Sequence, residues 1–281
     1  ASSDVYLNVS YVLRRADGIL PAGSSVSYDQ ICINEAGLES LSDRSGLPEY
    51  KDDGSHQIFS GTMTHEGVLA DRTSQWKAVF DVRKGALESY ELDGKQLMKS
   101  ALLPCFARAA TENDCGAGQQ NRTAMWRDAR FRTVKFEVNE TDSCYRVDLA
   151  FAPIGEAAQV FMSYEIYADG SIVAAEQLKD AGKLSEAEHM QRFGMEFAMP
   201  GEFSNIEYFG YGPHENYCDR YSSAVMGRFE QRVEDQYHYG YVRPQESGTR
   251  TQIKWMRVTD DNGTGLQVTS DVKFSASALP F

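Results

Sequence analysis

Apolar and polar residues alternate along most of this chain, which is the period of a β-strand with one buried face. The alternation is clearest in two runs on either side of the polar turn 139–142. Their apolar faces comprise Val134, Phe136 and Val138, and then Tyr145, Val147, Leu149 and Phe151. The two runs therefore predict an antiparallel hairpin.

Four further pairs of such runs flank turns rich in Gly, Asp and Pro, and each pair predicts another hairpin. They join residues 6–13 with 25–33, 75–82 with 86–92, 160–167 with 172–178, and 251–258 with 266–274. Helical signals are limited to a turn or two at 123–130 and 184–189. Strands and helices do not alternate as a barrel of eight βα units requires, so we expect an all-β, antiparallel sandwich of large sheets.

The hairpins suggest three parts along the chain. Two strands cannot fold alone, so residues 1–39 are interpreted as the end of a preceding β-sandwich domain. Residues 40–54 are rich in Ser, Asp, Glu and Gly and are predicted to be a linker. Residues 55–281 then form the main β domain.

The charge balance limits the partners of the chain. Its 28 basic and 41 acidic residues give a formal charge of −13, which repels nucleic acid and anionic membrane surfaces. No apolar run approaches the roughly 20 residues of a membrane helix, and the first residues lack the pattern of a signal peptide. We therefore expect no nucleic-acid or membrane partner.

Common catalytic and metal-binding motifs are absent from the sequence. There is no GxSxG nucleophile motif and no glycine-rich phosphate loop with its following helix. The five His lack HExxH spacing, and the five Cys form no CxxC pair. We therefore expect no metal site and interpret the cysteines as small apolar residues.

Two polar clusters stand out from this pattern. The first, at 106–114, includes Arg108, Glu112, Asn113 and Asp114. The second, at 210–220, includes His214, Glu215, Asn216, Asp219 and Arg220. Both clusters could be internally hydrogen-bonded loops, and both have the mixture of charged, amide and aromatic groups found in carbohydrate-binding grooves.

The second cluster resembles the Gly-Pro-x-Glu-Asn-Tyr-x-Asp-Arg signature of the C-terminal domain of glycoside hydrolase family 2 β-galactosidases, and residues 212–220 match every fixed position. Residues 241–250, which contain Glu246, are similar to the family's Tyr-Val-x-Pro-Gln-Glu-Asn-Gly-x-Arg, with Ser247 replacing Asn. The first cluster resembles its Arg-Ala-Pro-x-Asp-Asn-Asp, with Ala110 and Glu112 as departures, and Trp126 follows. The resemblance runs from about residue 76 to 281.

The resemblance implies a β supersandwich akin to galactose mutarotase, preceded at residues 1–39 by the last strands of an immunoglobulin-like domain. In the family a TIM barrel carries the two glutamates that hydrolyse terminal β-D-galactosides such as lactose with retention of configuration. Neither glutamate has a counterpart here, so the resemblance implies a non-catalytic part of a glycosidase. It also places the magnesium and sodium sites outside this chain. The family's Trp-bearing loop would follow Leu279-Pro280, so we expect truncation at this end.

The resemblance implies three kinds of partner, namely the remaining domains of a β-galactosidase, galactosides bound weakly, and other copies within a homo-oligomer. A bacterial cytoplasm or periplasm is expected, and the sequence does not choose between them. The candidate residues for contacting sugar or structuring loops are Arg108, Glu112, Asn113, Asp114, Trp126, His214, Glu215, Asn216, Asp219, Arg220 and Glu246.

Two alternative functions remain open at this point. One is a free-standing carbohydrate-binding module that uses the same fold. The other is an aldose epimerase, whose general acid and base would have to be His214 and Glu215. Adjacent residues on a strand face opposite ways, which makes the epimerase the weaker alternative.

Overall fold

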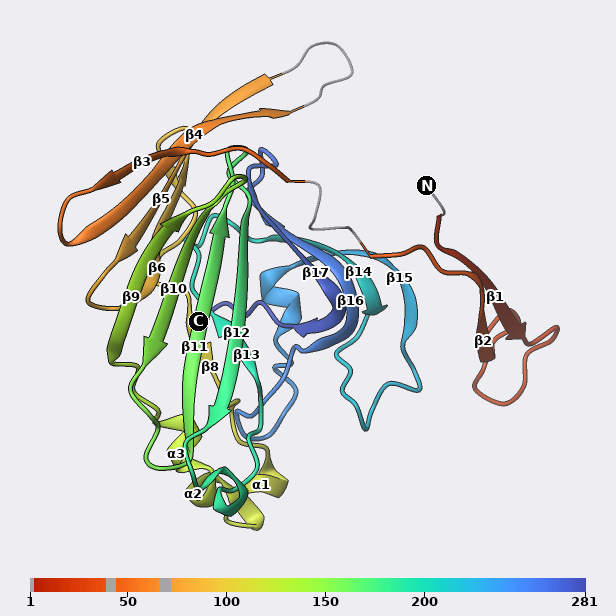
Figure 1. Ribbon diagram of the computed structural model, residues 1–281. Coiled ribbons are helices and arrows are strands. Elements are labelled where there is room, and N and C mark those ends of the chain that lie inside the picture. Colours follow the sequence, from red (N-terminus) through yellow and green to blue (C-terminus); the bar gives the residue numbers. More distant parts are fainter. Residues whose placement is uncertain (1–2, 39–43, 66–71) are drawn as a thin grey trace. The chain divides into compact units, whose positions relative to one another are not determined.

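Antiparallel strands are the main secondary structure of the described residues (Figure 1). The computed structural model describes residues 3–38, 44–65 and 72–281. The chain divides into two compact units, each described by itself below. Unit 1 comprises Ala1–Ser40, Ser204–His238 and Ser247–Phe281, and unit 2 comprises Leu41–Phe203 and Tyr239–Glu246. The predicted all-β class is confirmed.

The described residues of unit 2 form three sheets. The five-stranded sheet has the order β3 (Glu49–Asp52), β4 (His56–His65), β5 (Arg72–Asp81), β6 (Ala86–Leu92) and β7 (Lys95–Gln96). The four-stranded sheet has the order β12 (Ile172–Asp180), β11 (Ala158–Ile166), β10 (Tyr145–Phe151) and β9 (Thr133–Glu140). A small sheet pairs β8 (Leu103–Cys105) with β13 (Gly194–Glu196). The hairpins predicted from 75 to 92, 134 to 151 and 160 to 178 are confirmed.

Aromatic side chains from the two larger sheets of unit 2 meet in its core. Phe80 on β5 packs edge-on against Phe59 on β4 and Tyr164 on β11, with ring centroids 5.8 and 5.0 Å apart. All three side chains are fully buried. These contacts join the two sheets face to face, as the alternating sequence predicts for a sandwich.

The turn between β11 and β12 is fixed by two aromatic residues of the other sheet. The indole of Trp76 donates to the carbonyl of Ala168 at 3.1 Å, and the hydroxyl of Tyr90 donates to the carbonyl of Gly170 at 2.9 Å. Gly170 has a φ of +83°, and a Cβ there would lie 2.7 Å from Met63 Cε. The close approach of these side chains therefore requires glycine.

Short helices gather at one end of the β9–β12 sheet (Figure 1). They are α1 (Glu112–Gly116), α2 (Gln119–Arg122), α3 (Ala124–Arg127) and the 3₁₀ turn η1 (Leu184–Glu186). The sequence predicted helical turns around α3 and η1 but not α1 or α2. None of the helices in the described residues has the length and apolarity needed to cross a membrane.

Unit 1 contains a hairpin and a four-stranded sheet. The hairpin pairs β1 (Val5–Val12) with β2 (Ser25–Asn34). The sheet has the order β15 (Val225–Arg232), β14 (Asn205–Gly212), β16 (Arg250–Thr259) and β17 (Gly265–Ala276), and the 3₁₀ turn η2 (Val233–Gln236) follows β15. The core of this sheet is formed by Ile206, Tyr208, Ile253 and Met256.

The hairpin of unit 1 leaves large apolar side chains such as Leu7 and Ile33 exposed. Its ends are attached to β16 by Lys254, which is 6% exposed and donates to Asp4 at 2.7 Å and to the carbonyl of Ala36 at 2.8 Å. The hairpin itself was predicted, and its membership of a preceding domain stays a prediction. Of the predicted linker, residues 49–52 form β3, and 40–43 lie outside the described residues.

Candidate functional site

The first polar cluster forms the N-terminal cap of α1 in unit 2. The hydroxyl of Thr111 accepts a hydrogen bond from the backbone of Asp114 at 3.2 Å, and the Asp114 carboxylate accepts one from the backbone of Thr111 at 2.8 Å. Arg108 donates to the same carboxylate at 2.6 Å. This reciprocal cap accounts for the buried Asp114, and its Thr-x-x-Asp signal is readable in the sequence although it was not used there.

The charge of Asp114 is stabilised within this loop. Burial pushes the pKa of Asp114 up, but the hydrogen bonds from Arg108 and Thr111 outweigh it, so the pKa lies below its usual value. A carboxylate held ionised in this way is a structural anchor. It has no free proton for acid catalysis near neutral pH.

An aromatic group supports this end of unit 2. Trp126 is 3% exposed, donates to the carbonyl of Glu188 at 2.7 Å, and packs edge-on against Phe106 with centroids 5.9 Å apart. Phe193 stacks on Phe106 at 6.0 Å and is half-exposed. The predicted candidate Trp126 is therefore part of the core, whereas Phe193 presents an aromatic face that sequence reasoning missed.

The segment 239–246 lies beside α1 within unit 2. Glu246 is buried and accepts a hydrogen bond from Arg192 at 2.8 Å. The side chain of Gln245 accepts from the backbone of Glu112 at 3.3 Å, and Arg243 lies 3.9 Å from the Glu112 carboxylate. The structure thus brings together two motifs that are more than a hundred residues apart in the sequence. Glu112, Asn113 and Arg243 remain exposed at this surface.

The second cluster, in unit 1, is organised around the side chain of Asn216, which is fully buried. Its amide nitrogen donates to the carbonyls of Tyr211 and His214, both at 3.0 Å. Its amide oxygen accepts from the backbone and the hydroxyl of Thr251 at 3.0 and 2.6 Å. Every hydrogen-bonding group of this amide is used to fold the turn after β14.

Glu215 holds the same turn against the start of β16. One carboxylate oxygen accepts from the backbone of Gly248 at 2.8 Å, and the other pairs with Arg220. Gly248 has a φ of +86°, and a Cβ there would lie 2.7 Å from the carbonyl oxygen of Gln236. Only glycine fits this approach without strain.

Arg250, at the start of β16, is a buried residue that sequence reasoning did not single out. It is 4% exposed and donates to the carbonyls of Gly248 at 2.8 Å and Pro213 at 3.1 Å, and to the side chain of Gln231 at 3.1 Å. These bonds join β15, β16 and the turn after β14. The sequence signal was its place at the end of the third motif.

His214, Asp219 and Arg220 project from this turn into solvent. Nearby, the rings of Tyr211 and Tyr221 stack with centroids 6.1 Å apart, and Tyr221 is half-exposed. Exposed polar groups beside an aromatic face are the kind of surface that contacts sugars. The buried part of the cluster therefore folds the turn, whereas His214 and Asp219 are exposed and Arg220 pairs with Glu215 at its surface.

Comparison with known proteins decides the family. A family model described as the β-galactosidase small chain matches residues 72–281, which is most of the chain. The chain belongs to this β-galactosidase small-chain family. It is 28% identical over its whole length to a β-galactosidase of Priestia megaterium and 30% identical over 84% of its length to one of Lactobacillus delbrueckii subsp. bulgaricus.

The small-chain region accounts for a minor part of these relatives. This chain spans 26% of the Priestia megaterium protein, 23% of the Lactobacillus delbrueckii protein and 19% of a Halalkalibacterium halodurans β-galactosidase that is 30% identical over 69% of this chain. The motifs that suggested the family in the sequence all lie within the matched residues 72–281.

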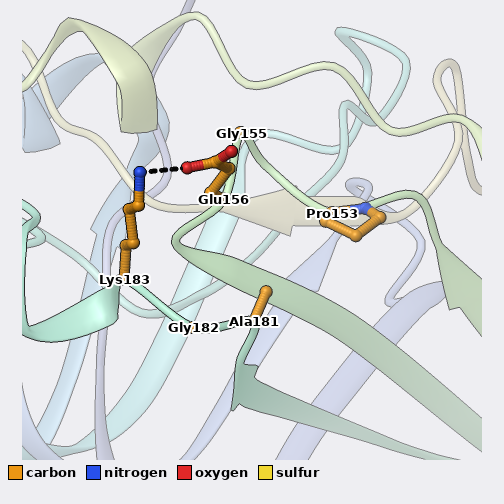
Figure 2. Close-up of a pocket in the computed structure, with 6 residues that line it drawn as sticks. All are labelled: Pro153, Gly155, Glu156, Ala181, Gly182 and Lys183. Atoms are coloured by element: carbon orange, nitrogen blue, oxygen red, sulfur yellow. Dashed lines mark ion pairs between the residues drawn. The ribbon is translucent and has the colours of Figure 1, made fainter.

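An open hollow of about 410 Å³ lies elsewhere on this small-chain protein, in unit 2 (Figure 2). It is formed by the turn after β10 and the turn after β12, and Glu156 and Lys183 face each other across it as an ion pair. The six residues that line it are Pro153, Gly155, Glu156, Ala181, Gly182 and Lys183. None of these six is aromatic or among the predicted candidates, so its lining lacks the stacking surface typical of a sugar site.

Proposed function

We propose that this chain is a non-catalytic C-terminal part of a β-galactosidase, which supports the active site and assembly of an enzyme that hydrolyses terminal β-D-galactosides. The observation that carries the proposal is the match of residues 72–281 to the small-chain family, together with the small share of each relative that the chain spans. A retaining glycosidase needs two carboxylates about 5 Å apart on either side of the scissile bond. The resemblance assigns that pair to a barrel outside this chain.

The contacts of the motif residues support a structural role. Asp114, Glu246 and Asn216 are buried and hydrogen-bonded within their own units. Groups that are used in this way fix loop shape and cannot take part in proton transfer to a substrate without first losing those bonds. Their function in the enzyme is therefore to present loops.

The proposal also covers sugar contact, assembly and ions. The exposed polar groups around α1 and after β14 would contact galactosides weakly, because they are not enclosed in a deep site. Other copies of the full enzyme are proposed partners in a homo-oligomer. The magnesium and sodium that the resemblance implies belong to the catalytic part, so no residue of this chain is assigned to them.

The proposal can be tested by complementation. The β-galactosidase of Priestia megaterium would be expressed without the region that aligns with this chain, and residues 1–281 would be fused in its place. We expect turnover of a chromogenic β-galactoside by the fusion and none by the truncated enzyme. The isolated chain should give no turnover above a heat-denatured sample.

Two results would contradict the proposal. Steady turnover by the isolated chain that survives Glu215→Gln but not heating would place a catalytic site within these residues. An open surface is expected to bind galactose only at about millimolar concentrations. If calorimetry instead measured micromolar galactose binding by the isolated chain, that result would favour a free-standing carbohydrate-binding module.

A further inference from the structure

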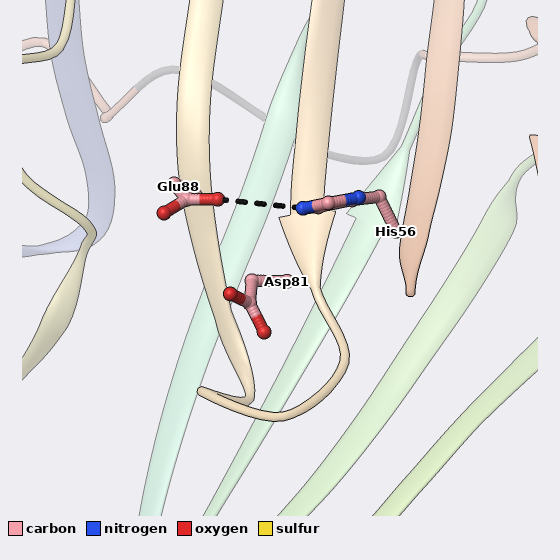
Figure 3. A group of neighbouring side chains, drawn as sticks. All are labelled: His56, Asp81 and Glu88. Atoms are coloured by element: carbon pink, nitrogen blue, oxygen red, sulfur yellow. Dashed lines mark ion pairs between the residues drawn. The ribbon is translucent and has the colours of Figure 1, made fainter. Parts of the chain in front are cut away.

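Three potential metal ligands converge at one end of the five-stranded sheet of unit 2 (Figure 3), and none of them belongs to the motifs used above. His56 is the first residue of β4, Asp81 the last of β5, and Glu88 lies in β6. His56 and Asp81 are register partners, and a register shift between Val79 and Phe80 leaves Glu88 at an irregularity of the next strand pair. One ligand atom from each of the three residues lies within 4.8 Å of the others.

The hydrogen bonds around His56 fix which ring nitrogen is available. The hydroxyl of Ser55 donates to the Asp53 carboxylate at 2.9 Å, so towards Nδ1 of His56, also 2.9 Å away, it can act only as an acceptor. Asp53 also lies 3.4 Å from Nδ1. Both neighbours therefore favour a proton on Nδ1. With that proton in place, the nitrogen of a neutral ring that can bind a metal is Nε2, which faces Glu88 at 3.8 Å.

A carboxylate or hydroxyl that accepts from the far side of the imidazole is the usual support of a metal-bound histidine. The backbone amides of Ser55 and His56 and the hydroxyl of Ser55 all donate to the Asp53 carboxylate and hold it beside the imidazole. The arrangement therefore supplies an imidazole together with the group that orients it.

The structure already places a cation against the two carboxylates. The ammonium of Lys84, in the turn between β5 and β6, pairs with Glu88 and lies 3.8 Å from Asp81. The Lys84 side chain is half-exposed, so it can move into solvent when another cation binds. One ammonium leaves part of the charge of Asp53, Asp81 and Glu88 uncompensated, which a divalent ion would neutralise more fully.

We propose that Nε2 of His56 and the carboxylates of Asp81 and Glu88 bind one divalent transition-metal ion of the zinc type, with water completing its coordination. One imidazole with two carboxylates suits zinc, cobalt and manganese more than calcium or magnesium, which prefer oxygen ligands alone. Bonds of about 2.0–2.2 Å require these partly exposed side chains to rotate inwards. The ion would join β4, β5 and β6 at this end and stabilise unit 2.

The metal site does not depend on the proposed function. It also differs from the sequence-based expectation, which was that the chain has no metal site. The three ligands are separated by 25 and 7 positions and come from three strands, so no spacing motif reveals them. Only the register of the sheet brings them together.

The probe is Co²⁺, titrated into the metal-free 281-residue chain and followed by its visible absorption. We expect one ion per chain with nitrogen and oxygen ligands, and at least a roughly tenfold loss of affinity in His56→Ala. Lys84→Met should bind more tightly than the unmodified chain, because the competing ammonium is gone. His189→Ala, an exposed histidine of the loop after η1, is the matched control and should bind like the unmodified chain.

Circular dichroism of each variant separates loss of binding from loss of fold. If His56→Ala did not fold, the gain of affinity in Lys84→Met would still decide the question. Unchanged affinity in Lys84→Met would overturn the proposal. So would an intense thiolate charge-transfer band, which would place the ion on one of the exposed cysteines Cys32, Cys115 or Cys218.

Discussion

The Glu176 carboxylate is covered within unit 2, where it lies on the four-stranded sheet. It lies on β12 opposite Met162 of β11, and Met162 is 2% exposed. Within the described residues neither carboxylate oxygen has a hydrogen-bond partner, and both oxygens are covered although part of the residue is exposed. Burial raises the pKa of Glu176 to about 8.

The raised pKa makes the stability of unit 2 depend on pH in a defined direction. In the unfolded chain the pKa returns to about 4.5, so at pH 7 folding must take up a proton. Below about pH 4.5 the Glu176 carboxyl is neutral in both states and costs no stability. As the pH rises to about 8, the free energy of unfolding of unit 2 falls, because the folded state must keep the proton or bury the charge. At about 1.36 kcal/mol per pKa unit the full loss approaches 5 kcal/mol, and partial exposure reduces it to about 2–4 kcal/mol.

Two substitutions separate the effect of the Glu176 charge on stability from the effect of its buried polar atoms. Glu176→Gln is neutral at every pH, so we expect it to be more stable than the unmodified chain by about 2–4 kcal/mol at pH 9 and nearly equal at pH 4. Glu176→Leu should be stabilising at both pH values, because it also removes an unsatisfied buried polar group worth about 1–3 kcal/mol.

Urea unfolding at pH 4, 7 and 9 measures these differences, with tryptophan fluorescence as the probe. Trp76 and Trp126 both lie in unit 2, so the signal reports mainly on this unit. Glu137→Gln on β9, where the carboxylate is half-exposed and paired with Lys135 at 2.8 Å, is the control and should change stability by less than about 1 kcal/mol. A stabilisation by Glu176→Gln that is the same at pH 4 and pH 9 would refute the reasoning.

Three further substitutions test the contacts of the motif loops and the hairpin. Asp114→Ala should lower the free energy of unfolding by about 1–2 kcal/mol, because the carboxylate's bonds from Arg108 and the backbone of Thr111 are lost, and its effect should fade below about pH 4 in calorimetric scans. Arg220→Ala should lower the melting temperature and cost about 1 kcal/mol, because Glu215 loses its ion pair with Arg220. Lys254→Ala should loosen the ends of the β1–β2 hairpin, which limited proteolysis would detect as faster cleavage near residue 36.

The strands were predictable because one face of most of them is buried. Val147 and Leu149 on β10 alternate with Arg146 and Asp148 because of that burial, and the observed register pairs them with Val138 and Phe136. The hairpin turns were predictable for a second reason, because Asp-Gly sequences such as Asp169-Gly170 supply the positive φ that such turns need.

The short helices and the partners of the buried charges were not predictable in the same way. α1 has five residues and no apolar period, so only its cap marks it in the sequence. The bonds from Arg192 to Glu246 and from Arg250 to Gln231 join residues that are distant in sequence. Such contacts follow from how the sheets are arranged, which local patterns do not encode.

The chemistry of Asn216 explains why the motif at residues 212–220 is a mark of the family and does not by itself indicate a reaction. This side chain gives two hydrogen bonds to carbonyls and accepts two from Thr251. Aspartate lacks the two donors and glutamine would displace the amide by one methylene, so asparagine is required by the turn itself. Glycine at 248 is required by backbone geometry in the same way. These positions specify a folded turn, and any sugar specificity has to reside in exposed neighbours such as His214 and Asp219.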